Sequence, residues 1–296
     1  MLAHGIKAVR EHLTSLPDSS GLAIEALRDA YDKAEYVFQM PEGITVESVT
    51  AGSVSAEILT PLSTEGARTI LYLHGGGYAL GSPRSHRHMV ANLAVAANAK
   101  AVLIDYRLAP ENPFPAAVDD AVSVYRWLLD NGTSADQVVI AGDSAGGGLA
   151  VATLLALRDQ SITLPAGGVC ISPWTDLTNS SETYETHATR DPMVTTASIN
   201  RWTDAYLGDR DPKTPLASPA HADLAGLPPL LIQVGTDEVL LGDSRLLAGN
   251  AEAAGVEVKL EEWENMIHVW HWFAEYLDEA GEATAGIATF VAARTG

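Results

Sequence analysis

A serine placed between glycines offers the clearest chemistry in the chain. Residues Gly142–Gly146 read Gly-Asp-Ser-Ala-Gly, the G-x-S-x-G pattern in which a serine occupies a sharp turn between a strand and a helix. An apolar run at 138–141 precedes the pattern, and an Ala/Leu-rich run at 149–157 follows it. These flanking runs disfavour an ordinary glycine-rich turn. We therefore predict that Ser144 is a nucleophile, with the positive end of the following helix dipole near the developing oxyanion.

A serine hydroxyl needs a general base, and the chain contains nine histidines. In this type of serine turn the base comes late in the chain. We predict His268 as the base, because it follows a predicted strand at 258–263 and lies near the C-terminus. His271 is the nearest rival, and His74 belongs to a glycine-rich segment with another role. The remaining histidines have the wrong chain order or the wrong element: His4, His12, His86, His88, His187 and His221.

The third catalytic group should be a carboxylate that orients the imidazole. It should follow a strand located between the serine and the histidine, and the apolar run at 229–234 predicts such a strand. Asp237 and Glu238 follow this run. Because neighbouring side chains diverge, we expect only one of the two to reach His268. Residue types alone leave both candidates open.

A strand that runs into three glycines is suited to supply backbone hydrogen-bond donors. Residues 71–78 read Leu-Tyr-Leu-His-Gly-Gly-Gly-Tyr, and glycine lets the backbone N–H groups turn inward. A phosphate-binding loop is the competing interpretation, but the spacings G-x-x-x-x-G-K-[ST] and G-x-G-x-x-G are missing from this segment. Together with the serine turn, the segment predicts an oxyanion hole.

The elements that position these groups alternate along the chain. Predicted strands lie at 69–73, 101–105, 138–141, 169–172, 230–234 and 256–262, and predicted helices near 82–98, 116–130, 145–159 and 243–254. Continuous apolar strands separated by helices indicate a mostly parallel sheet covered on both faces. Two alternating runs at 46–50 and 55–60 predict an antiparallel pair ahead of it. The predicted fold class is therefore α/β, a mostly parallel central sheet flanked by helices.

Two stretches fall outside this alternation and predict a helical cap. The first forty residues have an amphipathic helical pattern, and about sixty residues separate the strands that end at 172 and begin at 230. A connection of that length is usually functional. The predicted division is a cap at 1–45 and 175–225, and a catalytic core at 46–174 and 226–296. For a helix predicted at 196–207, the alternative is a packing role without gating.

Composition excludes several classes of function. The formal net charge of −20 disfavours binding to nucleic acid or to anionic membranes. The single cysteine, Cys170, lies in an apolar run and has no partner for an intramolecular disulfide. We expect no metal site, because no Cys/His cluster is present. Residues 1–13 lack the apolar core of a signal peptide, and no run of about 18 apolar residues occurs. We expect a cytoplasmic protein without stable membrane insertion.

Taken together, these motifs resemble those of the hormone-sensitive lipase family of bacterial esterases, in the branch with the Gly-Asp-Ser-Ala-Gly motif. The shared segments are His74–Tyr78, Asp105–Glu111, Phe114–Ala117, Asp119 with Asp120, Gly142–Gly147, Ser172–Trp174 and Met266–His268. They span about residues 68–290. The resemblance implies an α/β-hydrolase fold and hydrolysis of carboxylic esters through a serine acyl-enzyme, with no metal or organic cofactor.

The resemblance also implies roles for individual residues. Ser144 would be the nucleophile and His268 the base. The backbone N–H groups of Gly76, Gly77 and Ala145 would form the oxyanion hole.

The family's acid motif is Asp-Pro-Leu-Arg-Asp, and this chain departs from it. In the family the acid comes three residues after a small residue that ends the strand. Gly235 is that small residue here, so the register favours Glu238, and Leu240 then keeps its place in the motif. Asp237 would shift the leucine out of register and stays the rival acid.

Four aromatic residues are expected to line an apolar substrate pocket near the cap: Tyr78, Trp174, Trp202 and Tyr206. The resemblance implies short- to medium-chain acyl esters as substrates. Many members of the family form dimers, so a homodimer is a further expectation. A non-catalytic receptor on the same fold and an amidase or acyltransferase using the same residues are the alternative functions. The presence of His268 disfavours the receptor.

Overall fold

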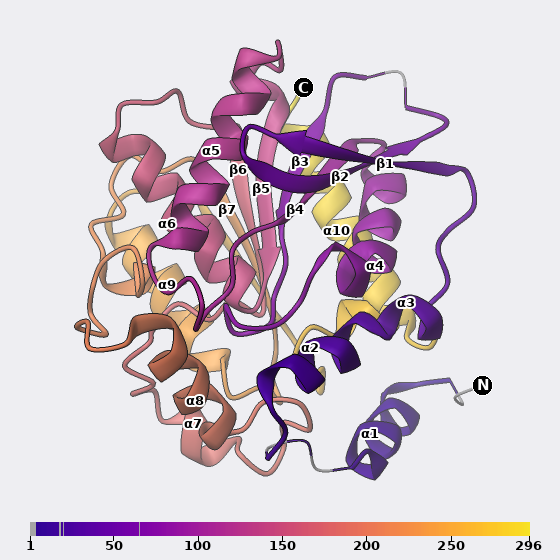
Figure 1. Ribbon diagram of the computed structural model, residues 1–296, viewed down its shortest axis with the longest axis vertical. Coiled ribbons are helices and arrows are strands. Elements are labelled where there is room, and N and C mark those ends of the chain that lie inside the picture. Colours follow the sequence, from indigo (N-terminus) through magenta and orange to yellow (C-terminus); the bar gives the residue numbers. More distant parts are fainter. Residues whose placement is uncertain (1–3, 18, 20, 65) are drawn as a thin grey trace.

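An eight-stranded sheet forms the centre of the computed structural model, which describes residues 4–17, 19, 21–64 and 66–296. Residues 1–3, 18 and 20, which belong to the predicted cap, and residue 65 lie outside the described residues. The strand order is β1-β2-β4-β3-β5-β6-β7-β8. Helices cover both faces of the sheet (Figure 1).

The sheet is antiparallel at one side and parallel across the rest. Its strands are β1 (Ile44–Ala51), β2 (Val54–Pro61), β3 (Thr69–Leu73), β4 (Lys100–Asp105), β5 (Val138–Asp143), β6 (Gly167–Ile171), β7 (Leu230–Gly235) and β8 (Val258–Trp263). β2 pairs antiparallel with both β1 and β4, and every other pairing is parallel. Every residue of β3, β5, β6 and β7 is buried, as continuous apolar runs require. The predicted α/β sheet with an antiparallel pair is confirmed.

Five longer helices cover the two faces: α4 (Pro83–Ala97), α5 (Ala116–Asp130), α6 (Ala145–Asp159), α9 (Leu241–Ala253) and α10 (Asp278–Arg294). The apolar cores place α4 and α10 on one face and α5, α6 and α9 on the other. Short 3-10 helices lie at η1 (Ala135–Gln137), η2 (Pro219–His221) and η3 (Trp270–Phe273). Each described helix is too short or too polar to cross a lipid bilayer.

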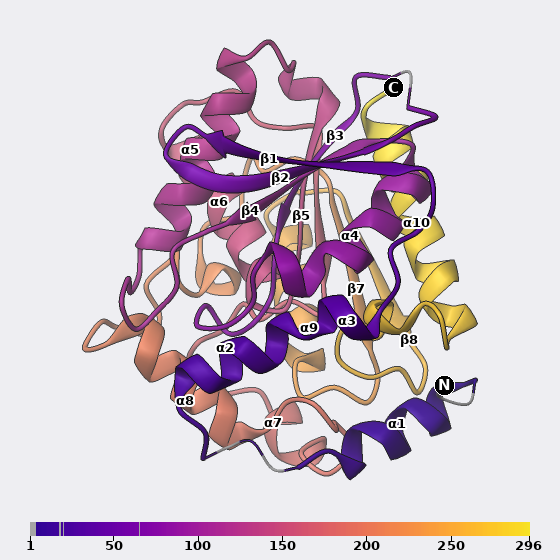
Figure 2. The same ribbon diagram turned by 45° about the vertical axis from the view of Figure 1, so that its right-hand side comes forward.

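Two groups of helices lie beyond one end of the sheet (Figures 1 and 2). The first precedes the sheet in the chain and comprises α1 (Ile6–Ser15), α2 (Ile24–Asp32) and α3 (Ala34–Val37). The second lies between β6 and β7 and comprises α7 (Thr183–Thr186) and α8 (Thr196–Leu207). The α8 helix has the predicted bounds, because Thr195 and Ser198 form a reciprocal capping box at its start.

Several predicted element boundaries differ from the observed ones by one or two residues, and two of these differences have a local reason. The helix predicted at 82–98 ends at Ala97, because Asn98 adopts a left-handed conformation that closes it. The strand predicted at 169–172 ends at Ile171, because Ser172 has a φ of 45° and turns out of the strand. That turn brings the Ser172 side chain into the functional site described next.

Candidate active site

Ser144 lies on a strained turn between β5 and α6. Its φ is 54° and its ψ is −122°, a region that costs a non-glycine residue of order 1–3 kcal/mol. The Ser144 N–H donates to the Ile171 carbonyl at 2.8 Å, and the Ser144 carbonyl accepts from the Trp174 N–H at 2.9 Å. These contacts fix the turn. A Cβ on Gly146 would lie 2.0 Å from the Leu73 carbonyl oxygen, so the turn packs against β3 only with glycine there.

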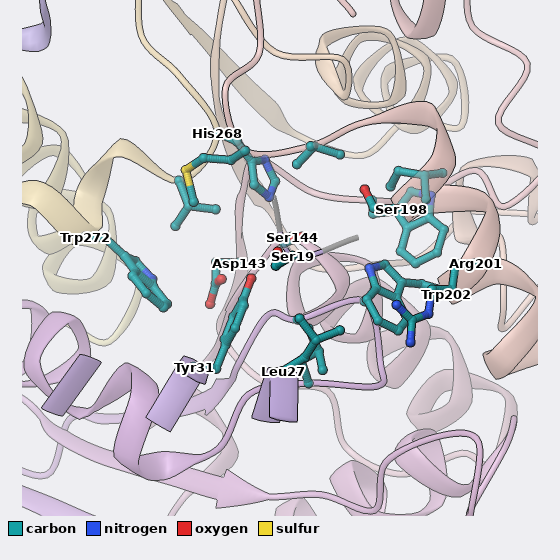
Figure 3. Close-up of a pocket in the computed structure, with 18 of the residues that line it drawn as sticks. Ser19, Leu27, Tyr31, Asp143, Ser144, Ser198, Arg201, Trp202, His268 and Trp272 are labelled. Atoms are coloured by element: carbon teal, nitrogen blue, oxygen red, sulfur yellow. The ribbon is translucent and has the colours of Figure 1, made fainter. Parts of the chain in front are cut away.

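His268 and Glu238 form a buried pair. His268 Nδ1 lies 2.9 Å from Glu238 Oε2, and the two side chains are 6% and 0% exposed. Burial lowers the pKa of His268, but the hydrogen bond to Glu238 and the negative charges of Glu238, Asp191 and Asp143 together outweigh burial, so the pKa lies above its ordinary value. With Nδ1 held by Glu238, the other ring nitrogen remains for the cavity that His268 and Ser144 both line (Figure 3).

The second oxygen of Glu238 is held just as firmly. Oε1 accepts from the Gly235 N–H at 2.6 Å and from the Ser172 hydroxyl at 2.7 Å. The same hydroxyl oxygen accepts at 3.1 Å from the N–H of Val269, the residue that directly follows His268. Ser172 therefore connects the acid to the histidine loop. Sequence reasoning missed this role, although Ser172 belongs to the Ser-Pro-Trp motif of the family resemblance, which was its only signal.

The rival acid, Asp237, points elsewhere. Its carboxylate forms an ion pair with Arg10 of α1 and lies 4.0 Å from an Arg190 nitrogen. Its backbone N–H donates to the Met266 carbonyl at 3.1 Å. The structure thus brings Glu238, and not Asp237, to His268. The side chains of these neighbours diverge, as expected from their adjacency.

Three backbone N–H groups, one of them in the serine turn and two in the glycine-rich loop, have no hydrogen-bond partner among the described residues. Within the described part of the chain, the amides of Gly76, Gly77 and Ala145 make no hydrogen bond. Gly76 and Gly77 have φ values of 115° and 62°, which favour glycine, and both line the cavity. The Gly75 amide, in contrast, is occupied by Asp143 Oδ1 at 3.1 Å and by His86 Nε2 at 3.2 Å.

His74 and His271, the other histidines in or next to the sequence motifs, are buried in the core and contact other core residues. The His74 ring stacks on Tyr106 with 4.1 Å between the ring centroids, and burial lowers the pKa of His74 to about 3. His271 Nε2 lies 2.8 Å from Gln233 Oε1, and burial lowers its pKa to about 3 as well. Neither is among the described residues that line the cavity. His86 does line the cavity, but its Nδ1 lies 2.8 Å from the Ser85 hydroxyl and its Nε2 accepts from the Gly75 N–H at 3.2 Å, so His268 is the histidine available to Ser144.

The cavity at Ser144 has a volume of about 220 Å³ and mostly apolar walls. Trp202 of α8 lies on one side of Ser144, and Tyr31 of α2 and Trp272 lie on the other (Figure 3). Trp174 also lines it, so Trp174 and Trp202 both lie where a pocket was predicted. Residues of the core and of both helical segments beyond the sheet therefore form the wall of the cavity.

The expectation that Tyr78 and Tyr206 line the pocket is corrected by their packing. Both side chains are fully buried, and their rings stack in parallel with 3.8 Å between centroids. Tyr206 also packs edge-on against Phe114. Neither tyrosine is among the described residues that line the cavity. The pair instead packs α8 against the glycine-rich loop.

Known proteins resemble the chain over nearly its whole length. The α/β-hydrolase fold family matches residues 70–272. An acetyl-hydrolase of Streptomyces hygroscopicus is 50% identical, over 92% of this chain and 91% of the relative. An esterase of Acinetobacter venetianus is 34% identical, over 93% and 90%.

Solved structures agree in fold and in class. The crystal structure of EstE5 soaked with p-nitrophenyl butyrate has a TM-score of 0.94 and 44% identity, over 98% of both chains. A hormone-sensitive lipase from a metagenome library has a TM-score of 0.96 and 38% identity, over 100% of both chains. The protein is therefore an esterase, and it belongs to the bacterial hormone-sensitive lipase family of α/β-hydrolases.

Proposed function

We propose that the protein hydrolyses short- to medium-chain carboxylic esters through an acyl-enzyme on Ser144. The observation that carries this proposal is that His268, whose Nδ1 lies 2.9 Å from Glu238 Oε2, lines one cavity with Ser144 and with Gly76 and Gly77, whose amides lack acceptors among the residues that the structure describes. Ser144 Oγ attacks the ester carbonyl carbon, and His268 removes the hydroxyl proton. Glu238 keeps the proton of His268 on Nδ1 and stabilises the imidazolium that forms.

The negative charge that develops on the carbonyl oxygen is accepted by the N–H groups of Gly76, Gly77 and Ala145. Donors of this kind typically contribute a factor of about 10²–10³ each to kcat. His268 then gives its proton to the departing alcohol as the carbon–oxygen bond breaks. A water molecule then attacks the acyl carbon and His268 takes its proton; His268 returns that proton to Ser144 Oγ as the bond between Oγ and the acyl carbon breaks, and the acid product leaves.

The size of the cavity supports a small acyl group. Its volume of about 220 Å³ is below the roughly 300–1,000 Å³ of pockets that hold drug-sized ligands. Leu27 of α2 and Ile199 and Trp202 of α8 contribute apolar wall, which suits an alkyl chain. The relative from Streptomyces hygroscopicus is named an acetyl-hydrolase, which supports an acyl group as small as acetyl. We also propose that segments 1–45 and 175–225 act together as a cap, because both contribute to this wall.

The test is turnover of p-nitrophenyl esters by Ser144→Ala. We expect the variant to keep its fold and to lose turnover and labelling by a fluorophosphonate probe. Ser48→Ala, an exposed serine on β1, is the matched control and should keep both. A Ser144→Ala enzyme that still turns over these esters would overturn the proposal. A parent enzyme that the probe does not label would indicate a receptor, and products transferred to added alcohol would indicate an acyltransferase.

A series of p-nitrophenyl esters tests the acyl-chain length. We expect activity to fall once the acyl chain exceeds about eight carbons, because a cavity of this size cannot enclose it. A rising rate over longer chains would instead favour a true lipase.

A further inference from the structure

Arg10 of α1 joins three segments that are far apart in the sequence. Its Nη1 donates to the Arg190 carbonyl at 2.7 Å, and its Nη2 donates to the Asn265 carbonyl at 3.3 Å. Nη2 also forms the ion pair with the Asp237 carboxylate. Asp237 directly precedes Glu238, Asn265 lies in the loop before His268, and Arg190 belongs to the segment between β6 and β7. One guanidinium therefore contacts the acid turn, the histidine loop and the predicted cap.

The rest of α1 is attached to the same histidine loop. Val9 is fully buried in a cluster that contains Met266, Ile267 and Trp270, the neighbours of His268. At the start of the helix, the Gly5 N–H donates to the Tyr276 carbonyl at 2.8 Å. The helix is thus held by an apolar contact and a backbone hydrogen bond, and Arg10 follows Val9 directly.

The other neighbour of Glu238 is held from the second helical segment. The Val239 N–H donates to Asp191 Oδ2 at 3.1 Å, and the Val239 carbonyl accepts from the Thr183 hydroxyl at 2.6 Å. Asp191 is buried. The two neighbours of Glu238 are therefore held by side chains from outside the sheet: Asp237 by Arg10 of the first helical segment, and Val239 by Asp191 and Thr183 of the second.

We propose that Arg10 is a positioning residue, through which α1 holds the acid turn and the histidine loop in catalytic register. This inference rests on the proposed function, in which Glu238 orients His268. The guanidinium suits the task because its planar fork donates to three acceptors from different segments at fixed angles, which an ammonium group does not reproduce. Its side chain and that of Asp237 are 26% and 21% exposed, so the pair is only partly screened by solvent.

The effect should be on the chemical step. A misplacement of about 1 Å in a catalytic group can cost a factor of ~10² in rate. For Arg10→Met we therefore expect kcat with p-nitrophenyl butyrate to fall about tenfold to a hundredfold, while KM changes little. Lys7→Met on the same helix is the control, since the Lys7 side chain is 90% exposed, and it should match the parent.

Rescue separates positioning from general stabilisation. Guanidinium chloride at a concentration that leaves the fold intact should restore part of kcat in Arg10→Met and none in Lys7→Met. Arg10→Lys should remain impaired, because it keeps the charge without the fork. In a double-mutant cycle, Arg10→Met and Asp237→Ala, which removes the acceptor, should be non-additive. A loss without rescue, or a loss that only follows a lower melting temperature, would show that Arg10 merely stabilises the fold and would refute the inference.

Failure of the inference is distinguishable from failure of the proposed function. Ser144→Ala and Glu238→Gln are assayed in parallel. If either retains full activity, the proposed function is wrong. If both lose activity while Arg10→Met equals Lys7→Met, the proposed function stands and the inference about Arg10 is wrong.

Discussion

Replacing Glu238 by glutamine should disable the enzyme through the tautomer of His268. In the parent, Glu238 Oε1 accepts from two donors, the Gly235 N–H and the Ser172 hydroxyl, and Oε2 faces His268 Nδ1. In Glu238→Gln the amide oxygen must take the Oε1 position, because an NH₂ group there would oppose both donors. The NH₂ group then faces Nδ1 and donates to it. The proton of His268 moves to Nε2, so the ring cannot accept a proton from Ser144.

The magnitude follows from the known cost of a wrong tautomer. In serine proteases the corresponding acid-to-amide change lowers kcat by ≈ 10⁴, which is about 5.4 kcal/mol at 1.36 kcal/mol per factor of ten. Asp237→Asn keeps an oxygen that can accept from Arg10 and leaves the Glu238 pair in place, so it should cost less than about tenfold. The initial rates of p-nitrophenol release from p-nitrophenyl butyrate, measured over a range of substrate concentrations, give kcat and KM for both variants. A larger loss in Asp237→Asn than in Glu238→Gln would refute this reasoning.

Three further outcomes are expected from the same site. Ser172→Ala removes a buried hydroxyl that joins the acid to the histidine loop, and it should destabilise the fold by about 1–3 kcal/mol in denaturant unfolding and lower kcat. Because the pKa of His268 is raised and the ring must be neutral to act, kcat/KM should fall on acidification with a midpoint above 6.5; a midpoint below that value would show that its acid partner does not act as described. Gly77→Ala places a Cβ 2.6 Å from Trp202 at a φ of 62°, so hydrolysis should drop sharply, whereas Gly249→Ala, with nothing within 4 Å, should be silent.

Much of the architecture could be predicted from local sequence patterns. The apolar runs of β3, β5 and β7 mark strands buried on both faces, and the helix patterns of α5 and α6 predict the observed bounds. These patterns can be recognised in the sequence because apolar residues occupy every position of a fully buried strand and recur along the buried face of a helix. The order of Ser144, the acid and His268 along the chain likewise follows from the fold class.

Tertiary structure decided which side chains meet. Asp237 and Glu238 are adjacent and carry the same charge. Their contacts distinguish them: Glu238 lies against His268, and Asp237 pairs with Arg10, more than two hundred residues earlier in the chain. In the sequence, Tyr78 and Tyr206 are aromatic residues like Trp174 and Trp202, and nothing local separates the two pairs. In the structure the two tyrosines stack on each other, and only the two tryptophans line the cavity.

By itself, the sequence determined the order of strands and helices, the glycine-flanked serine turn and the set of candidate groups, because each depends on residues that are neighbours along the chain. The tertiary structure alone decided the partner of His268, the bridge through Ser172 and the contacts of Arg10. Those contacts join segments that are far apart along the chain, so no local sequence pattern indicates them. The geometry of the contacts is set only when the sheet brings its strand ends together.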